Sequence, residues 1–142
     1  MQAEIAVQNI LANTAGVTAL VGSGANARIY YGRRVQTTIM PALTIEPDGI
    51  DPTDQKPDTT GTGEGRSRLD VEDVVVSSYG STFTEANTLS VAVRAALDKK
   101  SGGTYNSVVV QSIQFLGQDY FNEEIDPKYH VYEDRYRLRI VR

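Results

Sequence analysis

Three arginines alternate along the C-terminal segment of the chain, at a spacing that places them together on one side of a strand. Arg135, Arg137 and Arg139 occupy odd positions, whereas the even positions are mostly apolar. The even positions hold His130, Tyr132, Asp134, Tyr136, Leu138 and Ile140. Because strand side chains point alternately to opposite faces, residues 129–142 predict a strand that packs one face on a core and lines the other with positive charge.

Two roles suit this row of arginines, and the sequence leaves both open. In the first role, the row is an exposed strand face with weak salt bridges to neighbouring strands. The carboxylates considered for these bridges are Asp70, Glu72 and Asp119. In the second role, the row is a charged contact with another subunit or with DNA. Further candidates for such a contact lie in and around a tyrosine pair; they are Arg28, Tyr30, Tyr31, Arg33 and Arg34.

Residues 47–65 differ sharply in composition from the rest of the chain. They hold three of the five prolines, four glycines and one large apolar side chain, so they cannot bury enough surface to offset the entropy of ordering. We predict a long flexible loop or a projecting hairpin here. Its candidate contact residues are Asp48, Asp51, Asp54 and Asp58. Their spacing differs from the alternate acids of a calcium loop, which favours a solvated loop or a contact with a basic partner over a metal site.

The sequence predicts no catalytic, metal-binding or cofactor-binding residues and no cofactor. His130 is the only histidine and the chain has no cysteine, so a Ser-His or Cys-His pair would rest on one residue. We interpret His130 as a structural or surface residue. Gly61, Gly63 and Gly65 resemble a phosphate loop only superficially, because no Gly-Lys-Ser/Thr follows them.

The net charge of −4 is concentrated in residues 47–65, which hold one basic and five acidic side chains. A mildly acidic chain is a poor candidate for free binding to nucleic acid, because such binding depends on neutralising phosphates with Lys and Arg. The absence of cysteine fits a reducing compartment. Neither a signal peptide nor a membrane span is predicted, since the first basic residue is Arg28 and the N-terminal apolar stretch is interrupted by polar residues.

Apolar periodicity and turn signals predict an α+β protein. Helices are predicted near residues 3–13, 17–21 and 85–98, and strands at 28–32, 41–46, 66–79, 108–121 and 129–142. Thr82 and Glu85 form a capping box before the third helix, and Gly102 and Gly103 are expected to end it. A change of parity within residues 66–79 predicts a bulge or a strand covered on both faces. The expected fold of residues 1–142 is a single domain: a mostly antiparallel sheet of about four to five strands, two main helices on one face, and a long projecting loop or hairpin.

Several segments resemble, in their order and spacing, the tail-completion or tail-terminator proteins of long-tailed bacteriophages. They are the N-terminal helix, GVTALVG at residues 16–22, ARIY at 27–30, MPALTI at 40–45, AVRAAL at 92–97 and YRLRIV at 136–141. The resemblance covers most of the chain outside residues 47–65. It implies a non-enzymatic virion protein of the tail and neck, assembled in the cytoplasm of a bacterial host.

The same resemblance implies a ring, typically sixfold, on the head-proximal end of the tail tube. There the ring halts tube polymerisation and presents a surface to the neck proteins of the filled head. The implied partners are further copies of the chain in a hexamer, the tail tube protein, a neck or head-completion protein and, passively, DNA in the lumen, with no membrane. Two alternatives stay open: another neck or head-completion subunit, or a small cytoplasmic ligand-binding module or enzyme with a pocket that includes His130 and the tyrosines.

Overall fold

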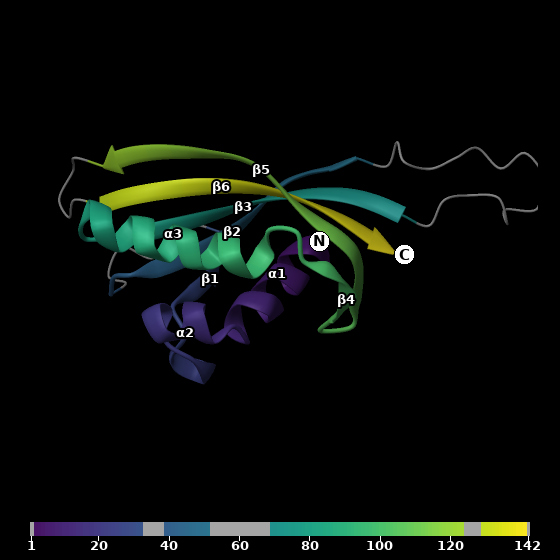
Figure 1. The fold of residues 1–142 in the computed structure, drawn as a ribbon, viewed down its shortest axis with the longest axis horizontal. Coiled ribbons are helices and arrows are strands. Elements are labelled where there is room, and N and C mark those ends of the chain that lie inside the picture. Colours follow the sequence, from purple (N-terminus) through teal and green to yellow (C-terminus); the bar gives the residue numbers. More distant parts are fainter. Residues whose placement is uncertain (1, 33–38, 52–68, 124–128, 142) are drawn as a thin grey trace, which may run out of the picture.

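A computed structural model of the chain describes residues 2–32, 39–51, 69–123 and 129–141 (Figure 1). In this part of the chain a curved sheet lies on one side and the α-helices lie on the other, so the structure has two layers. The helices are α1 (Gln2–Ala12), α2 (Ala15–Val21) and α3 (Phe83–Leu97), with a 3-10 turn, η1, at Gly24–Asn26. The predicted helices and the α+β class are confirmed.

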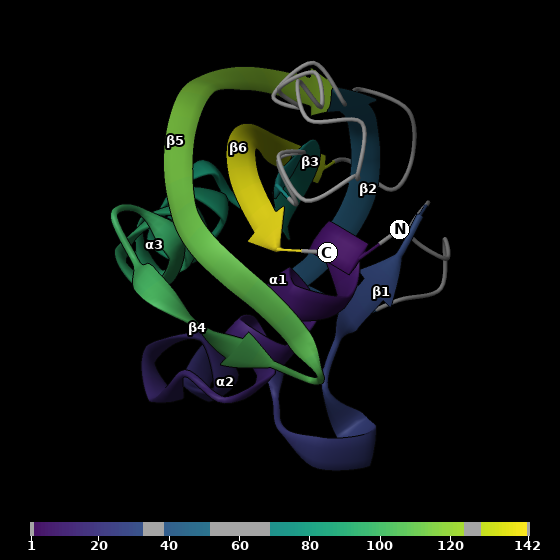
Figure 2. The same cartoon turned by 90° about the vertical axis from the view of Figure 1, so that its right-hand side faces the viewer.

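The sheet has six strands, one more than the upper end of the sequence prediction. They are β1 (Ile29–Tyr31), β2 (Ala42–Asp51), β3 (Leu69–Gly80), β4 (Ser101–Tyr105), β5 (Val108–Glu123) and β6 (Tyr129–Val141). Their order is β1-β2-β3-β6-β5-β4, and all neighbours are antiparallel except β1 and β2. Viewed along its length, the sheet curls strongly, and β5 follows much of that curl (Figure 2).

The additional strand, β4, lies where the sequence predicted only the end of a helix. Helix α3 does end nearby, at Leu97, but Gly102 and Gly103 form part of a strand that pairs with β5. A β-carbon at Gly102 would lie 3.0 Å from the backbone oxygens of Val110 and Gln111. The glycines therefore permit a close approach of two strands, a use of glycine that sequence alone does not separate from a helix stop.

The first residues of the acidic segment belong to a strand. Pro47–Asp51 continue β2 and pair antiparallel with β3, which agrees with the hairpin alternative of the prediction and not with a loop that starts at residue 47. Pro47 lies directly before a shift of register at Asp48, where an irregular ladder tolerates the missing N–H of proline. The rest of the predicted loop, residues 52–65, lies outside the described residues.

The predicted capping box at the start of α3 is present, with its second half displaced by one residue. Thr82 is the N-cap, and its hydroxyl oxygen accepts a hydrogen bond from the backbone N–H of Glu85 at 3.1 Å. The Glu85 carboxylate in turn accepts from the backbone N–H of Ser81 at 3.0 Å. These bonds fix the start of α3 directly after β3, where the backbone of Ala86 approaches Gly80 closely.

The core lies between the sheet and the helices, and β6 runs along it. Its largest buried aliphatic side chains include Leu11, Leu43, Ile45, Leu89, Leu97, Leu138 and Ile140. From Asp134 to Val141 the even positions are buried and the odd positions are exposed, which confirms the two-faced strand predicted from the sequence. Strand β3 stays in register with β6 along its whole length, so of the two alternatives predicted for residues 66–79, a bulge or a strand covered on both faces, the bulge is not found on β3; a register shift lies on its neighbour β2.

Candidate assembly surface

The three C-terminal arginines lie on the sheet face turned away from the helices. Because Tyr136 and Leu138 are buried against the core, the odd positions of β6 must point to the opposite side. We call this surface the open face. It comprises Glu46, Asp48, Asp73, Leu116, Asp119, Glu133, Arg135, Arg137 and Arg139.

Two of the arginines form ion pairs of very different quality. The guanidinium of Arg137 donates to both carboxylate oxygens of Asp73, at 2.9 and 3.0 Å, in the two-pronged geometry that arginine favours. The nearest approach of Arg135 to Asp119 is 3.8 Å, with these side chains 51% and 69% exposed. Of the partners predicted from sequence, Asp119 is confirmed. Glu72 is wrong, because its side chain is buried on the helix side opposite Leu138.

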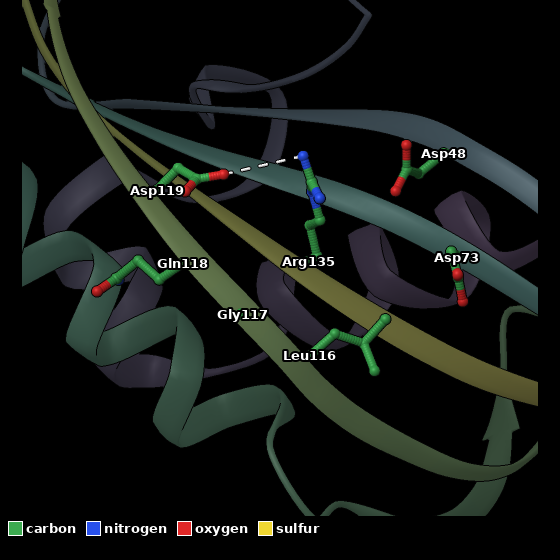
Figure 3. Close-up of a pocket in the computed structure, with 7 residues that line it drawn as sticks. All are labelled: Asp48, Asp73, Leu116, Gly117, Gln118, Asp119 and Arg135. Carbon is green, nitrogen blue, oxygen red and sulfur yellow. Dashed lines mark ion pairs between the residues drawn. The ribbon is translucent and has the colours of Figure 1, made fainter.

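Two strand irregularities create a hollow of about 350 Å³ beside Arg135 (Figure 3). The ladders shift register between Pro47 and Gly49 on β2 and between Phe115 and Gly117 on β5, which leaves Asp48 and Leu116 without a cross-strand partner. Such bulges re-aim side chains, and both of these residues line the hollow. The full lining is Asp48, Asp73, Leu116, Gly117, Gln118, Asp119 and Arg135.

Carboxylates crowd the open face around Arg135. Partial burial raises the pKa of Glu133; the charge of Arg135 opposes this shift, and Glu46, Asp119 and Asp48 add to it. Four carboxylates, those of Glu46, Asp48, Asp119 and Glu133, therefore lie near the one guanidinium of Arg135. The sequence suggested a basic strand face, but the region around Arg135 carries an excess of negative charge.

A buried polar cluster of Ser90, Gln118 and Asp134 lies on the helix side of the sheet, behind the hollow. Asp134 is 0% exposed, and its carboxylate accepts hydrogen bonds from the Ser90 hydroxyl of α3 at 2.9 Å and from the Gln118 amide of β5 at 2.7 Å. Burial raises the pKa of Asp134, and the two hydrogen bonds oppose this shift. The cluster ties β5, β6 and α3 together, so the backbone between Gly117 and Asp119 is fixed beside the hollow.

The predicted contact residues around the tyrosine pair divide into internal and exposed groups. Arg28 has an internal role, because its guanidinium donates to the backbone oxygens of Leu20 and Pro41, each at 2.8 Å. It thereby joins α2 and the start of β2. Tyr31 is exposed and Tyr30 is half-buried. The partial burial of the Tyr31 side chain and the charge of Glu4 raise the pKa of Tyr31.

The remaining predicted contact residues are only partly within the described chain. Asp48 lines the hollow, and Asp51 is the last residue of β2. Four others, Arg33, Arg34, Asp54 and Asp58, lie outside the described residues.

His130 belongs to an aromatic group where the last residues of β5 pair with the first residues of β6. Its Nδ1 lies 2.7 Å from the Tyr120 hydroxyl, and the two rings stack. Phe83, the first residue of α3, packs edge-on against Tyr120 and tilted against Tyr132. The hollow does not include His130, so the sequence alternative of a pocket built from His130 and the tyrosines finds no support in its lining.

Within the described ranges the structure offers no grouping of three His, Asp or Glu side chains suited to hold a metal ion. None of the three α-helices in that part of the chain has the length and apolar character needed to cross a bilayer.

Sequence reasoning missed Asp73, Leu116 and the buried role of Asp134. Two local signals point to them. Leu116 stands in Phe115-Leu116-Gly117, which breaks the alternation of its strand as a bulge does. Asp134 is the one carboxylate among the even, core-facing positions of β6, and a buried charge of this kind needs polar partners. No comparable signal identifies Asp73, because its pairing with Arg137 depends on the register of β3 against β6.

The charged open face extends across four strands, on the side of the sheet that the helices leave uncovered, and such a surface suits a contact with another protein. Residues 5–140 match the family described as tail completion protein gp17. Since this match spans nearly the whole sequence, the chain belongs to that family and is a structural component of a virion tail.

A solved structure of the virion of a native gene transfer agent particle contains a chain with a similar fold. The TM-score is 0.71 and the sequence identity is 20%, over 98% of this chain and 94% of that chain. At this identity the similarity concerns the fold alone. No curated protein sequence matches the chain.

Proposed function

We propose that the protein forms a ring that caps the head-proximal end of the tail tube, halts tube polymerisation and joins the tail to the neck. The observation that carries this proposal is the family match over residues 5–140, which assigns tail completion to the chain as a whole. A sixfold ring is the expected assembly, as for the tail-terminator proteins that the sequence resembles.

The open face supports this proposal physically. A closed ring of identical subunits needs a heterologous interface, in which one surface patch meets a different patch on the next subunit. The open face offers charge of both signs on a rigid sheet, whereas the opposite face is occupied by the helices. In this proposal the arginine row takes part in a contact with the tube or between subunits.

The acidic residues between β2 and β3 extend toward an adjoining ring in this proposal. Deleting residues 53–64 leaves both flanking strands intact, so the variant should fold and form rings but join poorly to the neck protein. A thermal melt gives the folding control, and co-sedimentation with purified neck protein gives the joining readout. Normal joining by the deletion variant would exclude this role for the segment.

The first experiment is native mass spectrometry of the purified protein over a concentration series, with negative-stain images of any large species. We expect closed rings near six subunits. The same protein added to polymerising tube protein should shorten the tubes and appear at one end of each. Tubes of unchanged length, with the protein absent from their ends, would contradict the proposed capping role.

A further inference from the structure

We propose that the hollow of the open face binds the Lys99–Lys100 turn of a second copy of the chain. The inference rests on the proposed function in one respect only, namely that the protein self-assembles. It adds the identity of the two surfaces that meet, which neither the family nor the fold specifies.

The hollow fits a cation because its carboxylates exceed its positive charge. Three aspartates and one arginine line it. Asp73 is already held by the two-pronged contact with Arg137. Asp48 and Asp119 remain exposed, and the 3.8 Å separation of Asp119 from Arg135 is beyond hydrogen-bond distance. An ammonium group has three donors and can form a charge-assisted hydrogen bond with either of these carboxylates.

The exposed apolar side chain beside these carboxylates fits the rest of a lysine. Leu116 is 41% exposed at the rim of the hollow, although it is a large aliphatic residue. Lysine carries its charge on a flexible four-carbon stem that packs readily on apolar surface. A lysine inserted here would place its stem on Leu116 and its ammonium beside an exposed carboxylate of the lining, Asp48 or Asp119.

The turn after α3 presents such lysines. Lys99 is exposed and has a positive φ of 58°, and the backbone N–H of Lys100 bonds to the oxygen of Leu97 at 3.3 Å. This bond holds the turn directly after the helix. The Lys100 ammonium lies 5.9 Å from the centre of the Tyr105 ring, a loose contact that leaves it able to move to a new partner.

The turn and the hollow lie on opposite sides of the sheet, so the partner must be another copy. Gln118 sends its side chain to Ser90 on α3, and the next residue of the strand, Asp119, therefore faces away from the helices. The Lys99–Lys100 turn follows α3, within the helix layer. A contact between two different patches on opposite sides repeats from copy to copy, which produces a ring if the rotation closes.

A charge exchange tests this contact. The variants Asp48→Lys/Asp119→Lys and Lys99→Glu/Lys100→Glu should each self-associate at least about tenfold more weakly than the unmodified protein, because like charges then face each other. Mixing the two variants in equal amounts should restore assembly. Each reversed hollow then meets a reversed turn, so the restored rings must alternate and contain an even number of subunits. Native mass spectrometry resolves this directly, since the two variants differ in mass.

Three single variants sharpen the test. Asn87→Glu adds a negative charge at an exposed position of α3 outside the turn, and Lys99→Glu reverses one charge in the turn; only the second should weaken assembly. Arg135→Glu makes the hollow more acidic: self-association that is kept or strengthened supports the lysine contact, whereas weakened self-association assigns the contact to the arginine row. A thermal melt of every variant confirms that the monomer remains folded.

The outcomes separate this inference from the ring proposal. Rings formed equally well by all charge-reversed variants would overturn the inference and leave the ring standing. Open filaments that depend on the hollow and the turn would support the inference and contradict the closed ring. Loss of assembly in Arg135→Glu, with normal assembly of Asp48→Lys/Asp119→Lys, would show that the arginine rather than the aspartates makes the contact. An unmodified protein that stays monomeric at all concentrations and on the tube would contradict both proposals.

Discussion

The two faces of β6 differ in how their charged side chains are paired, although residues of the two faces alternate along one strand. On the helix side, Asp134 is fully buried and its carboxylate is held by Ser90 and Gln118. On the open face, the next residue, Arg135, is half-exposed and approaches its partner Asp119 only to 3.8 Å. The covered face of β6 satisfies its one carboxylate within the subunit, whereas the open face of the strand leaves charge that a second molecule can satisfy.

Because of this difference, we expect the covered face to contribute mainly to folding stability and the open face mainly to assembly. Burial on the covered face makes each side chain there contribute to the free energy of unfolding, because the surrounding core cannot relax completely around a change. Exposed charges contribute little to folding and can be kept for binding. Matched substitutions on the two faces should therefore have very different effects on stability.

The largest difference is expected for leucine truncation. Leu138→Ala on the covered face should lower the free energy of unfolding by about 2–5 kcal/mol, because Leu138 is fully buried in the core and its loss leaves a cavity. Leu116→Ala on the open face should change it by less than about 0.5 kcal/mol. Urea denaturation of both variants gives the comparison. A cost above 2 kcal/mol for Leu116→Ala would mean that Leu116 is part of the core and does not serve a contact.

Adding a methyl group should give the next largest difference. A β-carbon at Gly80 would lie 2.5 Å from the backbone nitrogen of Ala86, so Gly80→Ala must push α3 away from β3. We expect a loss of about 1–3 kcal/mol in the free energy of unfolding. The matched control is Gly117→Ala, because a β-carbon there would meet nothing within 4 Å. Equal melting temperatures for the two variants would contradict the close packing of α3 on the sheet.

The buried carboxylate should make stability depend on pH in a direction opposite to that of most aspartates. Burial raises the pKa of Asp134 in the folded state above its value in the unfolded chain. The folded state therefore holds this proton more tightly, and the free energy of unfolding falls as pH rises from the unfolded pKa to the raised folded pKa. Asp134→Asn keeps the shape of the side chain and cannot ionise; its amide oxygen can still accept from Gln118, and its NH2 can donate to the Ser90 hydroxyl. The variant should therefore gain stability relative to the unmodified protein over that interval.

Urea denaturation at several pH values measures this difference. Some slope should persist in Asp134→Asn, because burial also raises the pKa of Glu72 on the covered face. The control Asp119→Asn removes a carboxylate from the open face and tests whether any surface charge change has the same effect. A constant difference between Asp134→Asn and the unmodified protein at all pH values would show that Asp134 does not change its proton affinity on folding.

The covered face was more predictable from sequence than the open face. Alternation from Asp134 to Val141 and the Thr82–Glu85 cap are local patterns, and each is present in the structure. Their physical basis is periodicity, which a sequence displays directly. By contrast, β4 was missed because its paired glycines also fit a helix stop. The extension of β2 through Asp51 could be predicted only as one of two alternatives, a hairpin or a loop, because Pro47 lacks the N–H that a strand ladder uses.

The open face depends on features that periodicity does not specify. Its hollow exists because two bulges, on strands far apart in sequence, shift Asp48 and Leu116 toward the same point. The pairing of Arg137 with Asp73 depends on the register of β3 against β6. The register between strands is set by the whole core. The sequence therefore predicts the row of arginines, but it does not predict which arginine forms an ion pair within the subunit.

The smallest expected effect concerns the two ion pairs of the open face. A double-mutant cycle on Arg137 and Asp73 should give a coupling of about 0.5–1 kcal/mol, because the contact is two-pronged and partly shielded. The same cycle on Arg135 and Asp119 should give a coupling near zero, since the groups are 3.8 Å apart and exposed. Alanine variants in urea denaturation at low salt measure both. A coupling for Arg135 as large as that for Arg137 would mean that Asp119 is held within the subunit and is not available to a lysine of another copy.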